Sequence, residues 1–199
     1  MADKAQPSSG RIRLFVGVPL PDDVVTATEA TIDAVRARMA GARWIPAENR
    51  HVTLAFLGPV EVAGRAWIEA RLREVAIGAS PFRTVTTRLG GFPSSERARV
   101  VWLGLDDAHG RFPALASRVQ DALSPRFEPE RRAFSPHITL ARSSKPLTLA
   151  DAEAPAPTHA EAGFVVDHIV LFRSHPGRPA PRYERLAIFR LDGGRLGEG

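Results

Sequence analysis

A five-residue pattern occurs twice in this chain and limits how the chain can fold. Residues 51–55 read HVTLA and residues 137–141 read HITLA. In an extended strand successive side chains point to opposite faces, so the His and the Thr of each copy share one face. The apolar residues Val52, Leu54, Ile138 and Leu140 then share the other face. Each copy therefore predicts a strand with a buried apolar back and a front that carries an imidazole and a hydroxyl.

The remaining periodicity predicts an α+β fold in a single domain. Alternating apolar residues indicate strands, and apolar residues at helical spacing indicate helices. Strands are expected at the second His-x-Thr copy and at residues 11–19, 51–57, 82–89, 98–105, 164–173 and 182–191. Helices are expected at residues 22–40, 60–77 and 109–123. The first helix is expected to be capped by Asp22 or Asp23. Many strands follow one another directly, which favours an antiparallel sheet with helices on one face over a repeated βαβ arrangement.

The order of the elements predicts two lobes. A strand, a helix and a His-x-Thr strand come first, and a hairpin, a helix and the second His-x-Thr strand follow, which indicates a duplicated arrangement. Loops are expected at 90–95 and 143–163, where Gly, Pro, Ser and Ala are frequent. Residues 1–10 are predicted to be a disordered tail, 11–191 the domain and 192–199 a frayed tail.

Composition sets the class of protein. The 199 residues are 44% apolar and 25% charged, as in an ordinary globular domain. No apolar run is long enough to cross a bilayer and no signal peptide is recognisable, so we expect a cytoplasmic protein. There is no cysteine, which excludes disulfides and thiolate metal sites. The net charge of +5, carried mostly by arginine, permits an anionic substrate, although it can equally reflect the base composition of the source genome.

Two histidines on adjacent strand fronts can perform acid–base chemistry. The imidazole pKa of about 6.5 makes both protonation states accessible near neutrality. One neutral imidazole can take a proton from water while a protonated one gives a proton to a leaving oxygen. Hydroxyls beside them can donate hydrogen bonds to oxygens on which charge develops. This set of groups suits hydrolysis of a strained phosphodiester, and it needs neither a metal nor a covalent intermediate.

The doubled motif resembles the two-histidine (2H) phosphoesterase superfamily, and within it the LigT-like RNA 2′,3′-cyclic phosphodiesterases. The resemblance rests on HVTLAFLG and PHITLAR, and it extends to RLFVGVPLP, Trp44-Ile45, ARVVWLGL and the closing VLFRSHPGRPAPRYERLAIFRL, with Ser174, Gly177 and Tyr183 at the expected places. It implies a bilobal α+β fold, with antiparallel sheets around a central cleft and helices on the outer faces. It also implies hydrolysis of an RNA terminal 2′,3′-cyclic phosphate to a 2′-phosphate, and in some members 2′,5′ joining of tRNA halves.

The same resemblance assigns roles to individual residues. His51 and His137 would be the catalytic pair, with His51 as the acid that protonates O3′ and His137 as the base that activates water. Thr53 and Thr139 would hold phosphate oxygens, and Arg142 would contact the phosphate. No cofactor and no metal are expected, and the protein is expected to act on RNA as a monomer without a membrane.

Several other residues leave the sequence open to two interpretations. Arg142 is five residues after His137, so in a regular strand it would point away from the cleft unless a bulge re-aims it. Phe56 is expected in the core, as are Trp44, Trp67 and Trp102. Arg131 and Arg132 could contact RNA or form a solvated cluster. No functional role is expected for His109, His159, His168 or His175, and a zinc site is not expected.

Two other functions fit the same residues. A relative with the same fold could act on a different small cyclic nucleotide, an ADP-ribose cyclic phosphate or a 2′,5′-oligoadenylate. A non-catalytic RNA-binding module could have the same fold without turnover, but the intact His and Thr of both motifs argue against that.

Overall fold

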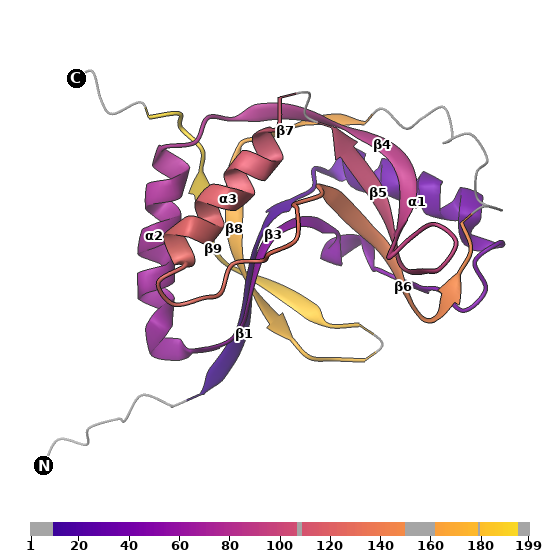
Figure 1. The fold of residues 1–199 in the computed structure, drawn as a ribbon, viewed down its shortest axis with the longest axis horizontal. Helices are drawn as coiled ribbons and strands as arrows, with labels where there is room; N and C mark the ends of the chain where they lie inside the picture. Colours follow the sequence, from indigo (N-terminus) through magenta and orange to yellow (C-terminus); the bar gives the residue numbers. More distant parts are fainter. Residues whose placement is uncertain (1–9, 107–108, 150–161, 179, 195–199) are drawn as a thin grey trace, which may run out of the picture.

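The computed structural model describes residues 10–106, 109–149, 162–178 and 180–194 (Figure 1). These residues form nine strands and three α-helices, which confirms the predicted α+β class. In chain order the elements are β1 (Arg11–Pro19), α1 (Asp22–Arg36), β2 (Arg43–Trp44), β3 (His51–Glu61), α2 (Arg65–Ile77), β4 (Phe82–Phe92), β5 (Ala98–Asp106), α3 (Arg111–Leu123), β6 (His137–Leu147), β7 (Gly163–Val166), β8 (His168–His175) and β9 (Arg182–Arg190). Short 3-10 turns precede β3 and α2.

The strands form one antiparallel sheet in the order β7-β4-β5-β6-β3-β1-β8-β9, with β2 beside β6. The two His-x-Thr strands, β3 and β6, are neighbours at its centre and pair only at Val52 and Ile138. Each is flanked on its outer side by an earlier strand of the chain, β1 or β5. The predicted duplication therefore appears as two half-sheets joined at the motif strands. The extent of the domain, residues 11–191, stays a prediction.

The helices cover the apolar face of the sheet. α2 and α3 pack on each other and on β3, β8 and β9, whereas α1 lies over the other half (Figure 1). Val35 and Met39, in and just after α1, contact Val101 and Ala141 there. Val52, Leu54, Ile138 and Leu140 are each at most 2% exposed, as predicted. No helix of the described residues is long and apolar enough to cross a membrane.

Three strands are longer than predicted, because pairing with a neighbour overrides local turn signals. β3 continues through Gly58 and Pro59 to Glu61 opposite β1, so the helix predicted from residue 60 begins only at Arg65. β4 continues to Phe92 through a segment predicted as a loop, and β6 continues to Leu147. Gly58 has a φ of +68°, a conformation that glycine adopts without strain.

Other local predictions are also corrected. The strand predicted at 164–173 is two strands, because β7 pairs with β4 at one end of the sheet while β8 pairs with β1 near the other. Helix α1 ends at Arg36 rather than near residue 40, and its capping position is Pro21, without a side-chain cap. Residues 192–194 are not frayed, since their amides donate to carbonyls at the end of α2 and just after it. Most of the predicted loop 143–163 and of both tails lies outside the described residues.

Candidate active site

The pairing of β3 with β6 brings the four motif residues together. Val52 and Ile138 are antiparallel partners. The same register, continued by one residue each way, places His51 opposite Thr139 and Thr53 opposite His137. Cross-strand partners share a face of the sheet, and this face is opposite the buried one. We call it the histidine face.

The hydrogen bonds of the imidazoles define their tautomers. The Nδ1 atom of His51 is 2.7 Å from the carbonyl oxygen of Asn49, and that of His137 is 2.8 Å from the carbonyl oxygen of Ser135. A carbonyl oxygen can only accept, so Nδ1 carries the hydrogen in both rings. In the neutral state each Nε2 therefore presents a lone pair, and the Nε2 of His51 accepts from the Thr53 hydroxyl at 2.9 Å.

Both imidazoles are less basic than a free histidine. The pKa of His51 is lowered to about 4, mainly by burial and to a smaller extent by the charges of His137 and Arg142, against a raising effect of the Asn49 carbonyl. Burial also lowers the pKa of His137, and Arg142 adds to this while the Ser135 carbonyl opposes it. Both rings are consequently neutral at pH 7, and a bound anion is needed to favour a protonated one.

Aromatic side chains from neighbouring strands surround each imidazole. The centroid of His51 lies 4.7 Å from that of Phe15 and 5.4 Å from that of Tyr183. His137 lies 5.1 Å from Phe92 and 6.2 Å from Trp102. Trp102 is thus half-buried beside the site rather than in the core, which corrects its prediction. Trp44 and Trp67 pack against the core as predicted.

Glycines leave room for these rings. A Cβ atom on Gly17 would lie 2.8 Å from the carbonyl oxygen of Val52 and 3.2 Å from Cδ2 of His51. A Cβ atom on Gly90 would lie 2.2 Å from the Trp102 ring, so the indole can lie flat across β4 only because residue 90 has no side chain. Sequence reasoning missed both glycines, because Gly17 lies inside a predicted strand and Gly90 inside a segment predicted as a loop.

A bulge in β6 turns Arg142 to the histidine face. Thr139 is opposite Trp102, but Ala141 is opposite Val101, so β6 contains one extra residue there. Leu140 and Ala141 are both buried in succession, and Arg142 is exposed. Its charge acts on both histidines and on Tyr183, as their pKa shifts show. The structure thus provides the bulge on which the prediction for Arg142 depended.

A second bulge makes the prediction for Phe56 wrong. Gly17 is opposite Thr53 while Val16 is opposite Ala55, so Leu54 is the extra residue of β3, and Phe56 comes to lie opposite Phe15. The bulge reverses the alternation, which buries Leu57 and leaves Phe56 71% exposed. Phe56 therefore lies on the histidine face, with its ring 6.2 Å from that of Phe15.

The remaining candidates lie apart from the four motif residues. Arg132 forms an exposed ion pair with Glu130, which fits the solvated alternative, and Arg131 is exposed beside it. His175 pairs with Glu184 at 2.6 Å and His168 with Asp167 at 2.5 Å. Among the described residues no group of three or more His, Asp or Glu side chains could hold a metal ion. His159 lies outside the described part of the chain.

Comparison with known proteins agrees with this arrangement. The family model of the 2′-5′ RNA ligase superfamily matches residues 21–178. The RNA 2′,3′-cyclic phosphodiesterase of Geobacillus stearothermophilus is 32% identical over 196 residues, which cover 95% of this chain and 61% of that protein. The enzyme of that name from Methanothermobacter thermautotrophicus is 27% identical over 91% of this chain and all of its own length.

Solved structures show the same fold. A protein of Thermus thermophilus has a TM-score of 0.75 and 29% identity, over 90% of this chain and 98% of its own. Escherichia coli LigT complexed with 3′-AMP has a TM-score of 0.74 and 27% identity, over 91% and 98%. The resemblance noted in the sequence is confirmed, and this chain belongs to the 2′-5′ RNA ligase superfamily of 2H phosphoesterases.

Proposed function

We propose that this protein hydrolyses the 2′,3′-cyclic phosphate at the end of an RNA strand to a 2′-phosphate. The observation that carries the proposal is the antiparallel pairing of Val52 with Ile138, which puts two imidazoles and two hydroxyls, all half-buried, on one face of the sheet. The names of the Geobacillus and Methanothermobacter relatives support the reaction, and the LigT complex with 3′-AMP supports nucleotide binding.

The reaction follows from the groups on the histidine face. The cyclic phosphate lies between the two Nε2 atoms. The Thr53 hydroxyl turns its hydrogen from Nε2 of His51 to one non-bridging oxygen, and the Thr139 hydroxyl donates to the other. One neutral imidazole takes a proton from water as the water oxygen forms a bond to phosphorus. The bond from phosphorus to O3′ breaks, and the other imidazole, protonated, gives its proton to O3′. The products are a 2′-phosphate and a free 3′-hydroxyl.

The charge of the substrate explains how the acid forms. Both imidazoles are neutral in the free protein, and an anionic phosphate between them raises their pKa values. His51 was expected to be the acid. Its pKa of about 4 in the free protein favours the opposite assignment, with His51 as the base and His137 as the acid.

The function is tested with 2′,3′-cyclic nucleotides in the presence of EDTA, with the product identified by phosphorus NMR. A 2′-phosphate is expected, and the His51→Ala and His137→Ala variants should each lose at least about 10²-fold in kcat. Absence of turnover, or a 3′-phosphate product, contradicts the proposal. Circular dichroism of both variants checks that they are folded.

A sulfur substrate separates acid from base. When O3′ is replaced by sulfur, the leaving thiolate needs no protonation, because thiols have a pKa of only about 8.5. With this substrate, substitution of the acid should lower kcat only slightly, whereas substitution of the base should lower kcat as much as it does with the oxygen substrate. Rescue of the His137→Ala variant assigns His137 as the acid, and rescue of His51→Ala assigns His51.

Ligation activity, a monomeric state and a cytoplasmic location are further parts of the same proposal. Joining of tRNA halves through a 2′,5′ bond would use the same groups, with a 5′-hydroxyl in place of water attacking phosphorus as the bond to O3′ breaks. The His51→Ala variant should therefore abolish joining and hydrolysis together. A monomeric, cytoplasmic enzyme stays a prediction, for which sedimentation equilibrium gives the oligomeric state.

A further inference from the structure

Arg43 stands next to Arg142 across two paired strands. In the register of β2 with β6, Arg43 is opposite Arg142 and Trp44 is opposite Ala141. Trp44 packs against the core and Ala141 is buried, so the other pair points to the histidine face. Both arginines are exposed. This face thus presents two guanidinium groups side by side.

Among the described residues, no carboxylate forms an ion pair with either guanidinium. The ion pairs between described residues include neither Arg43 nor Arg142. Strands β2 and β6 contain no Asp or Glu, and the one acidic residue of β5, Asp106, is at the end of that strand away from Val100, which is opposite Arg142. Like charges directly opposite each other destabilise a sheet, and guanidinium groups bind phosphate through paired hydrogen bonds. The pair is therefore suited to an anion from outside the protein.

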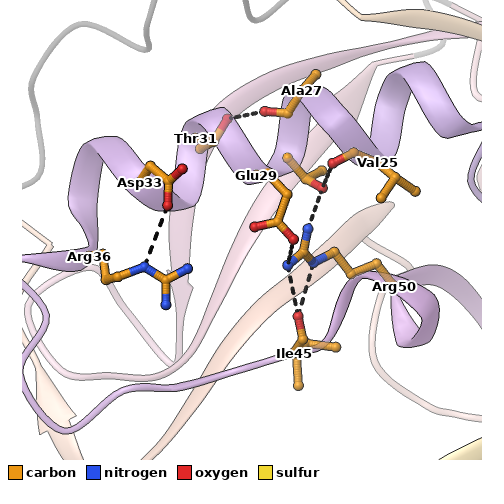
Figure 2. A network of polar contacts seen from close by, with 9 residues as sticks. Val25, Ala27, Glu29, Thr31, Asp33, Arg36, Ile45 and Arg50 are labelled. Atoms are coloured by element: carbon orange, nitrogen blue, oxygen red, sulfur yellow. Dashed lines mark hydrogen bonds and ion pairs between the residues drawn. The ribbon is translucent and has the colours of Figure 1, made fainter.

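The strand that carries Arg43 is held rigidly. The amide of Ile45 donates to the carbonyl oxygen of Leu140 at 2.8 Å, which continues the pairing with β6. The carbonyl of Ile45 accepts two hydrogen bonds, at 3.0 and 2.9 Å, from the buried guanidinium of Arg50 (Figure 2). That guanidinium also forms a 2.7 Å ion pair with Glu29 of α1 and donates to the Thr28 hydroxyl at 2.9 Å.

The guanidinium of Arg36 adds a contact from α1, 5.3 Å from the centroid of the Trp44 ring. β2 is thus fixed to both α1 and β6 on either side of its single exposed arginine. A preorganised arginine loses less entropy on binding a ligand than a mobile surface arginine does.

Arg142 and Arg43 are placed to contact two different anionic groups of the substrate. Arg142 is three residues beyond Thr139, and the bulge takes up one of them, so it begins roughly 7 Å along the strand from the hydroxyl that holds the scissile phosphate. The bulge puts Arg142 on the histidine face of the strand that also carries His137 and Thr139, which places its guanidinium near that phosphate. Arg43, on the neighbouring strand, is then left for a different anionic group.

We propose that Arg43 binds a second phosphate, the phosphodiester that joins the terminal nucleotide to the rest of the RNA strand. This deepens the proposed function and rests on it. It makes the end of an oligonucleotide a better substrate than a cyclic mononucleotide, through recognition of charge and without recognition of sequence.

The test compares hydrolysis of four cyclic phosphates. These are a mononucleotide, the same mononucleotide with a 5′-phosphate, a dinucleotide, and that dinucleotide with an uncharged methylphosphonate linkage. The wild type should show a KM roughly tenfold lower for the dinucleotide than for its uncharged analogue, as expected for one charge-assisted contact. In the Arg43→Gln variant this ratio should fall close to one, while Arg43→Lys should retain part of it.

Arg73→Gln is the matched control. Arg73 is exposed on α2, on the opposite side of the sheet, and the substitution changes the net charge by the same amount. The control should retain the wild-type ratio, and a 5′-phosphate that lowers KM by itself supports recognition of phosphate alone. The proposal is overturned if the wild type does not distinguish the two dinucleotides, or if Arg43→Gln and Arg73→Gln act alike. Failure to hydrolyse any of the four compounds contradicts instead the proposed function.

Discussion

Each imidazole of the histidine face is held through Nδ1 by a carbonyl of the segment just before its strand. The carbonyl belongs to the residue two positions earlier in both cases, Asn49 for His51 and Ser135 for His137. The approach of the chain to each strand therefore sets the tautomer. Burial then makes both rings weak bases, so binding of the anionic substrate is needed to favour the acid.

The pH dependence of kcat/KM follows from the lowered pKa values. The active free enzyme has one protonated and one neutral imidazole, and this form is most abundant between the two pKa values. Both are below 6.5, so we expect a bell-shaped profile with its maximum below pH 6.5. Above the maximum the acid loses its proton and kcat/KM falls, by up to about tenfold per pH unit. A flat profile between pH 5 and 9 contradicts the acid–base pair.

Arg142 provides an internal check on that profile. Its positive charge lowers both histidine pKa values, so in Arg142→Gln the alkaline limb should move to higher pH. The rate itself should also fall if Arg142 contacts the phosphate. Arg73→Gln should leave the limb in place, because Arg73 lies on the other side of the sheet.

Gly17 should control the position of the His51 ring. Since a Cβ atom there would lie 2.8 Å from the Val52 carbonyl oxygen and 3.2 Å from the ring, Gly17→Ala should displace the imidazole. Misplacement of a catalytic group by about 1 Å can cost on the order of 10²-fold, so we expect that loss in kcat with a smaller change in KM. Gly64→Ala is the control, because its Cβ atom would make only a 3.4 Å contact. A wild-type kcat in Gly17→Ala would show that this glycine does not position His51.

At the scale of elements, two bulges decide which side chains the histidine face contains. The bulge in β6 turns Arg142 toward the histidines, and the bulge in β3 brings Phe56 out of the expected core. Both occur after the His-x-Thr pair, so they leave the motif residues on one face and change only the orientation of later residues in each strand. Bulges next to active sites commonly re-aim side chains in this way.

The β3 bulge predicts opposite effects for two adjacent residues. Leu57 is buried, so Leu57→Ala should lower the free energy of unfolding by about 2–4 kcal/mol. Phe56 is 71% exposed, so Phe56→Ala should lower it by less than about 1 kcal/mol. Urea unfolding of both variants measures the difference. A larger loss from Phe56→Ala would mean that β3 alternates regularly and that Phe56 belongs to the core.

At the scale of the molecule, the two half-sheets meet at few points. β3 and β6 share one residue pair, and β2 extends the junction by two more. The buried Arg50 strengthens it, since it joins the segment between β2 and β3 to α1 (Figure 2). The site thus lies at the junction of the halves, where each half contributes one histidine and one threonine.

Burial of neutral histidines at this junction should make the fold sensitive to mild acid. The unfolded chain protonates His51 near pH 6.5, whereas the folded protein resists protonation down to about pH 4. Between these values the unfolded state binds more protons, so the free energy of unfolding falls as pH falls, by up to about 1.4 kcal/mol per pH unit from this residue. Urea unfolding between pH 7 and 5 should show a shallower slope for His51→Gln, and an unchanged slope would contradict the lowered pKa.

The sequence by itself determined the two motif strands, their buried residues and the family. Strand alternation assigns Val52, Leu54, Ile138 and Leu140 to the core from local spacing alone, and a doubled five-residue pattern is specific enough to identify relatives. These properties depend on residues close together in the chain, where the geometry of one strand suffices.

Only the tertiary structure decided where Phe56, Arg142 and Arg43 lie. A bulge depends on the register with a neighbouring strand, and the partners β1 and β5 are distant in the sequence from the residues that they re-aim. The same is true of β2, whose two residues show no strand periodicity and are a strand only because β6 pairs with them. Alternation fixes which residues share a face within a strand, but hydrogen-bond register between strands determines which side chains meet.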